Sequence, residues 1–155
     1  MTNDGQTLLR SAMSAVRKCA DAMEAQAEGL RQALPGVPID AALRAPTLGL
    51  CAGLKDTSGR VVFELALLLT ELGEGKADLA TASRSLSRMD ATMMGALEGV
   101  ADVVDRLERA AEQDENYEAA FVLVIEAAGV MLQSFENARA ATQALGAAMA
   151  AAEGT

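Results

Sequence analysis

A seven-residue repeat of apolar side chains over residues 76–113 is the feature that most constrains the fold. Large apolar residues recur at strict seven-residue spacing, at Leu79, Leu86, Met93, Val100 and Leu107. A second set of apolar residues lies between them, at Ala82, Met89, Ala96, Val103 and Ala110. Five heptads of this kind predict one long helix that packs against its neighbour with a left-handed supercoil.

Two other stretches have the same period. The first, residues 6–34, repeats at Leu9, Val16, Met23 and Leu30. The second, residues 117–152, repeats at Phe121, Ala128, Phe135, Thr142 and Met149. A charged segment, residues 112–118, precedes this last helix and contains no Gly or Pro. We expect a break there, with Asp114 or Asn116 as the cap, although a continuous kinked helix is the alternative.

Between residues 35 and 59 the chain changes character, because all three prolines and four glycines fall there. Proline cannot continue a helical hydrogen-bond ladder, so the first helix is expected to stop at Pro35. Asp40 is expected to cap a short helical turn that Pro46 limits. The sequence thus predicts a 25-residue connection, residues 35–59, whose apolar side chains pack on the core as a cap or a lid.

These patterns predict a single domain, residues 1–155, with an elongated antiparallel all-α four-helix bundle. The helices are expected over residues 6–34, 58–72, 76–113 and 117–152, with the long Pro/Gly-containing loop between the first two. Composition agrees with helices, because only 3% of the residues are aromatic and Trp is absent. Alanine, the commonest residue, is the best helix former, whereas sheets favour aromatic and β-branched residues.

The charge of the chain argues against nucleic acid as a partner. The formal net charge is -9, and the 13 basic residues are scattered along the sequence. An acidic surface repels phosphate backbones. There is no histidine, which removes the commonest general base and metal ligand, so we expect no cofactor and do not favour an enzymatic function.

The two cysteines, Cys19 and Cys51, lie 32 positions apart and have no partner suited to zinc or redox chemistry. The first five residues lack the features of a signal peptide. We therefore expect buried, reduced thiols and a cytoplasmic location, with a disulfide as the less favoured alternative. The longest dense apolar run, Val61–Leu69, is too short to span a membrane.

Apolar residues on the second helix exceed what one buried stripe requires. The run Val61–Leu69 is apolar almost all round, which is typical of a central helix or of one covered by a second subunit. The first half of the last helix has a similar excess. We therefore expect a homodimer, or docking to another helical protein, through Val62, Leu69, Val122, Ile125 and Leu132. Coverage of this surface by the loop 35–59 is the competing explanation.

Three functional hypotheses follow. The leading one is a non-enzymatic interaction module, that is, a scaffold, adaptor or assembly protein. The alternative is a bundle that binds a small apolar ligand between the second and fourth helices, under the loop 35–59. Its pocket would be lined by Phe63, Phe121, Met131 and Phe135. The least favoured is a metal enzyme that uses Glu64 and Glu126 as a buried pair, because each fits a solvent-facing helix edge better.

Overall fold

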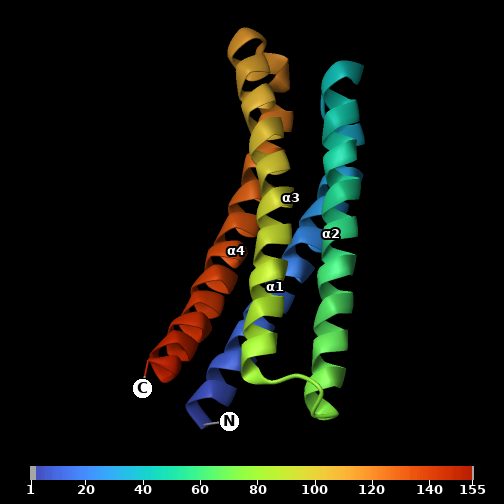
Figure 1. Cartoon of the computed structure of the whole chain (residues 1–155). Coiled ribbons are helices and arrows are strands. Elements are labelled where there is room, and N and C mark those ends of the chain that lie inside the picture. The colour runs from blue at the N-terminus through green and yellow to red at the C-terminus, as the bar shows by residue number, and fades with distance from the viewer. Residues whose placement is uncertain (1–2, 155) are drawn as a thin grey trace.

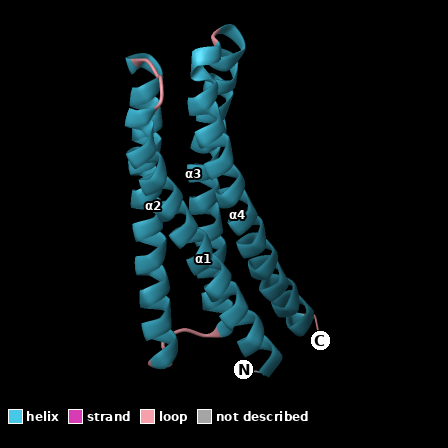
Figure 2. Ribbon diagram, turned by 180° about the vertical axis from the view of Figure 1, so that it is seen from behind, coloured by secondary structure: helices cyan, strands magenta, loops and turns pink. Residues whose placement is uncertain are grey.

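The computed structural model describes residues 3–154 and consists of four long helices, with the loops confined to the ends of the bundle (Figures 1 and 2). The helices are α1 Asn3–Ala33, α2 Ala41–Gly73, α3 Leu79–Gln113 and α4 Glu118–Glu153. Single 3-10 turns, Leu34–Gly36 and Glu115–Tyr117, lie in two of the connections. No strand occurs among the described residues. The prediction of an all-α four-helix bundle is confirmed.

The four helices do not pack as equal corners of a square. α1 and α3 contact each other and also contact both remaining helices. Among the described residues, α2 and α4 each pack on this central pair, without substantial packing against each other, and lie on its opposite sides (Figures 1 and 2). The outer faces of α2 and α4 consequently point in different directions.

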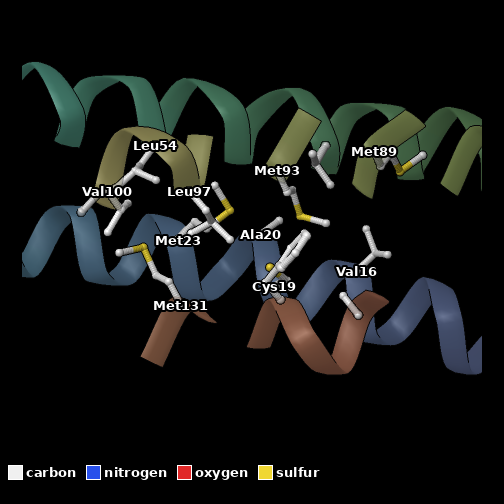
Figure 3. Packing of buried hydrophobic residues seen from close by; sticks show 14 of the residues in the cluster. Val16, Cys19, Ala20, Met23, Leu54, Met89, Met93, Leu97, Val100 and Met131 are labelled. Carbon is white, nitrogen blue, oxygen red and sulfur yellow. The ribbon is translucent and has the colours of Figure 1, made fainter. Parts of the chain in front are cut away.

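The heptad positions predicted from the sequence form the core. In α1, Leu9, Val16, Met23 and Leu30 are all buried, and in α3 the predicted positions are buried or half-buried. Figure 3 shows side chains from all four helices gathered in one layer, including Met23 of α1, Leu54 of α2, Leu97 of α3 and Met131 of α4. Fully buried alanines, among them Ala12 and Ala20, keep the helix backbones close.

The predicted loop over residues 35–59 is wrong, because α2 begins at Ala41 and the non-helical connection covers only residues 37–40. Asp40 caps the whole of α2: its carboxylate accepts a hydrogen bond from the Leu43 N–H at 2.9 Å. Pro46 lies inside the second helical turn, where it removes one ladder hydrogen bond. The next residue, Thr47, is buried and donates its hydroxyl hydrogen to the Leu43 carbonyl at 2.8 Å.

The other two connections agree with the sequence more closely. α2 ends in a turn in which Gly75 adopts a positive φ of 73°, a conformation that favours glycine. Asp78 then caps α3 by accepting from the Thr81 N–H at 2.8 Å. The expected break between α3 and α4 is present, and Asp114 accepts from the Asn116 N–H at 3.0 Å.

Two of the polar contacts between neighbouring helices involve a buried or largely buried side chain. On the α1–α2 side, the buried Ser58 hydroxyl donates to the Ala20 carbonyl at 2.7 Å. On the α3–α4 side, Arg139 donates to the largely buried Asp90 carboxylate at 2.8 Å, and its guanidinium lies 4.8 Å from the Phe135 ring centroid. The first contact fixes the register of α1 against α2.

Replacing Ser58 with alanine should lower the free energy of unfolding by about 1 kcal/mol, the typical net contribution of one intramolecular hydrogen bond. Chemical denaturation followed by circular dichroism measures this difference. Ser11→Ala, at an exposed position of α1, is the matched control and should change the free energy by less than about 0.5 kcal/mol. Equal effects of the two substitutions would contradict a structural role for the Ser58 bond.

Candidate interaction surface

The C-terminal half of α2 is apolar on nearly every side, yet it has neighbours on one side only. Its buried positions alternate at three- and four-residue spacing, at Leu54, Ser58, Val61, Leu65 and Leu68. This spacing is the single stripe that a helix on the edge of a bundle can bury. Of the two interpretations of this apolar run, a central helix is therefore wrong for the single chain, and the remaining apolar residues of α2 lie outside the core.

These remaining residues are unusually exposed for their size. Phe63 is 69% exposed, Leu69 60% and Leu67 49%. Ala66 is also exposed, and Val62 is half-buried against the core. We call these five residues the α2 outer face. A contiguous apolar surface of this kind marks interaction sites in soluble proteins far more often than scattered exposed leucines do.

A groove of about 320 Å³ runs beside the α2 outer face, between α2 and α1. Its apolar lining comes from Met13 of α1 and from Leu65, Ala66 and Leu69 of α2. Arg10 and Arg17 of α1 lie on the same groove. The α1 side of the outer face is thus apolar at its base and positively charged at its edge.

A second groove, of about 450 Å³, lies on the other side of the outer face, between α2 and α3. Leu67 and Leu68 contribute apolar surface, and Glu64 and Glu71 of α2 add two carboxylates. Arg88 lines the α3 side and donates to the Ser85 hydroxyl of its own helix at 3.1 Å. The edge of α2 that faces α3 is therefore negatively charged.

Three of these charges have no ion-pair partner among the described residues. Arg10, Glu64 and Glu71 form no ion pair among residues 3–154, whereas Arg17 pairs with Asp21 at 3.1 Å one helical turn away. Exposed pairs of that kind contribute little to stability. The charges beside the α2 outer face are consequently available to a partner.

The predicted interface residues fall on two separate surfaces. Val62 and Leu69 belong to the α2 outer face, whereas Val122, Ile125 and Leu132 are exposed on α4. Because α2 and α4 lie on opposite sides of the α1–α3 pair, these two sets cannot form the single contiguous patch that we expected.

The predicted ligand pocket between the second and fourth helices is also wrong. The two helices do not pack against each other, and the loop that was expected to cover them is part of α2. Phe63 points to the exterior, whereas Met131 and Phe135 are buried in the core and Phe121 is half-buried. These four side chains therefore do not line a common cavity.

The two candidate carboxylates are both exposed and lie on different helices. Glu64 is on α2 and Glu126 on α4, so they form no buried pair. The structure thus agrees with the interpretation that each marks a solvent-facing helix edge. Within residues 3–154 no group of three or more carboxylate or thiol side chains is placed to hold a metal ion.

Both thiols are free and buried, as the sequence predicts. Burial in the core, together with the nearby Asp90 carboxylate, raises the pKa of the Cys19 thiol to about 11. Burial also raises the pKa of Cys51. A raised thiol pKa suppresses the nucleophilic thiolate, so neither cysteine is suited to covalent chemistry.

Among residues 3–154, one helix satisfies the length and composition of a membrane span. The stretch Glu115–Glu153, which contains α4, reaches a mean hydropathy of 1.5. The expectation that nothing spans a membrane rested on the shorter run Val61–Leu69 and did not include this stretch. α4 also supplies core residues that pack against both α1 and α3, and core helices of soluble proteins pass the same test.

Sequence reasoning missed the charged edges of the surface, although a signal was present. Arg10 and Arg17 stand seven residues apart, and so do Glu64 and Glu71. Heptad spacing places each pair along one side of its helix. Searching for heptads of charge, in addition to heptads of apolar residues, would have found both pairs.

Comparison of the chain with protein families, with curated proteins and with solved structures found no match.

Serine substitutions on the α2 outer face should leave the single chain stable. Phe63→Ser and Leu69→Ser are expected to change the free energy of unfolding by less than about 0.5 kcal/mol, because the side chains are exposed. Leu65→Ala, one residue from the outer face but buried, should cost about 2–5 kcal/mol. Chemical denaturation at a protein concentration too low for self-association measures all three. A loss for Phe63→Ser as large as that for Leu65→Ala would assign Phe63 to the core.

Proposed function

We propose that this protein is a non-enzymatic helical interaction module, a scaffold, adaptor or assembly protein, which binds its partner through the α2 outer face. The observation that carries the proposal is the exposure of Phe63, Leu67 and Leu69 on the side of α2 that faces away from the bundle, with Leu69 toward α1 and Leu67 toward α3. Burying aromatic and leucine side chains of this size is the main source of affinity in helix docking.

The chemistry of the remaining side chains supports a binding function. The chain contains no histidine, its two thiols have raised pKa values, and its candidate carboxylates are separated on the surface. Free thiols persist in reducing compartments, so we place the protein in the cytoplasm.

The α2 surface is favoured over the exposed apolar residues of α4. On α4, the exposed apolar side chains are Val122 and Ile125 at 41%, Val130 at 46% and Leu132 at 47%, and Glu126 and Gln133 interrupt the surface. On α2 the exposure is greater, and an apolar groove adjoins the exposed side chains. A groove beside a protruding aromatic residue gives a partner both an anchor and a pocket.

Site-specific photo-crosslinking in cells tests the proposal. A benzophenone analogue of phenylalanine at position 63 should give a discrete crosslinked species, whose second polypeptide mass spectrometry identifies. The same analogue at position 122 reports on the α4 surface, and at position 101, exposed on α3, it reports on background. We expect a product from position 63 that is at least about tenfold more abundant than from the other two.

Two outcomes would contradict the proposal. If position 63 gives no product above the level of position 101, the α2 outer face is not a docking surface. If position 122 alone gives a product, the interface lies on α4 and the α2 assignment is wrong.

A further inference from the structure

We infer that the partner of the α2 outer face is a second copy of this chain, and that the two α2 helices pack side by side in parallel. The inference rests on the proposed function, because it names the occupant of the same surface. It is carried by the charges that border the apolar residues on each side.

The two borders of the outer face have opposite signs. Arg10 and Arg17 lie on the α1 side, and Glu64 and Glu71 lie on the α3 side. With the exception of Arg17, these side chains have no ion-pair partner among the described residues. A surface that carries both signs on opposite borders can complement itself, in spite of the net charge of -9.

Two-fold symmetry allows two ways of pairing this surface with itself face to face. If the axis runs across α2, the helices are antiparallel and the arginines of one copy face the arginines of the other. If the axis runs along α2, the helices are parallel and the arginines of each copy face the glutamates of its partner. Like charges placed opposite each other oppose association, so the charge pattern selects the parallel arrangement.

The positions of the arginines along the axis of α2 also match those of the glutamates. The Ser58–Ala20 hydrogen bond places antiparallel α1 against α2, so that Arg17 lies level with Val61. By the same register Arg10 lies level with Leu68, one heptad further along. In a parallel pair each arginine is therefore offset along the helix axis by three residues, roughly 4.5 Å, from a glutamate of the other copy. Long arginine and glutamate side chains span such a displacement.

The seam of the parallel pair has the composition that close packing requires. The outermost positions of α2 follow heptad spacing, at Gly59, Phe63, Ala66 and Thr70, and all four are exposed. Gly59 and Ala66 allow two helices to approach, and the two Phe63 rings meet between them. Leu67 and Leu69 flank the seam and close it against water.

Arg88 does not reverse this pattern. It belongs to α3, on the far wall of the α2–α3 groove, and its guanidinium is directed to Ser85 of its own helix. Glu64 and Glu71 belong to α2 itself and so lie closer to the seam. The partner's arginines consequently meet the glutamates before they meet Arg88.

Charge reversal tests the pairing without changing the apolar seam. Sedimentation velocity over a concentration series should show the wild-type chain at twice its 16.0 kDa subunit mass. The double variant Arg10→Glu/Arg17→Glu and the double variant Glu64→Arg/Glu71→Arg should each raise the dissociation constant at least about tenfold. The fourfold variant, which exchanges both borders, should return the constant to near the wild-type value. Circular dichroism confirms that each variant is folded.

Disulfide formation between introduced cysteines tests the parallel orientation of the two α2 helices. Thr70→Cys should form an intermolecular disulfide on mild oxidation, because equivalent residues of a parallel pair lie opposite each other. The native thiols are buried and do not compete. Gln133→Cys, exposed on α4, is the matched control and should remain reduced.

The possible failures are distinguishable. A wild-type monomer at every concentration, with a position-63 crosslink to a different polypeptide, overturns self-pairing and leaves the proposed function intact. No crosslink at position 63 overturns both. A dimer that neither reversal weakens, or a folded fourfold variant that stays monomeric, overturns the charge pairing. Absence of the Thr70→Cys disulfide in a dimer overturns the parallel orientation.

Discussion

Direct packing of α1 against α3 is the constraint on which the rest of the structure depends. α1 and α3 contact each other across the centre of the bundle, and fully buried alanines of α1, such as Ala12, Ala20 and Ala27, occupy little volume in the core around them. α2 and α4 are then held on opposite sides, and each has only two neighbours. Such a helix buries one stripe, and every further apolar residue faces outward. The exposed surface of α2 follows from this geometry.

Much of the fold could be predicted because three helices have regular heptads of large apolar residues. The sequence predicts α2 only from Ser58 onward, because the buried stripe of α2 up to that point includes Thr47, Cys51 and Ser58. Hydroxyls at seam positions weaken an apolar pattern, yet here each donates to a carbonyl and is well accommodated. Pro46 and several glycines argued locally against a helix, and tertiary packing overrode them. The first half of α2 packs closely on α3: a Cβ added at Gly99 of α3 would lie 3.3 Å from a side-chain carbon of Leu50.

The candidate surface was predictable in part. Excess apolar residues on two helices could be counted from the sequence, and Val62 and Leu69 do belong to the α2 outer face. Which helices become neighbours depends on how the buried faces of all four helices pack together. The apolar pattern of one helix does not determine it. For that reason Ile125 was assigned to the same patch as Leu69, although the two helices point in different directions. The charged borders also depend on how the helices pack, because Arg10 of α1 borders the α2 outer face only once α1 lies beside α2.

The two buried thiols can report local opening of the core. Alkylating reagents attack the thiolate, and burial in the core keeps Cys19 and Cys51 protonated and enclosed. Either cysteine can react only when its part of the core opens. Cys19 lies among residues of the central layer (Figure 3), whereas Cys51 lies close to Glu28 and Arg31 of α1. The alkylation rate of Cys19 therefore reports how often the middle of the bundle opens, and that of Cys51 reports how often the α1–α2 contact opens. No added probe is needed.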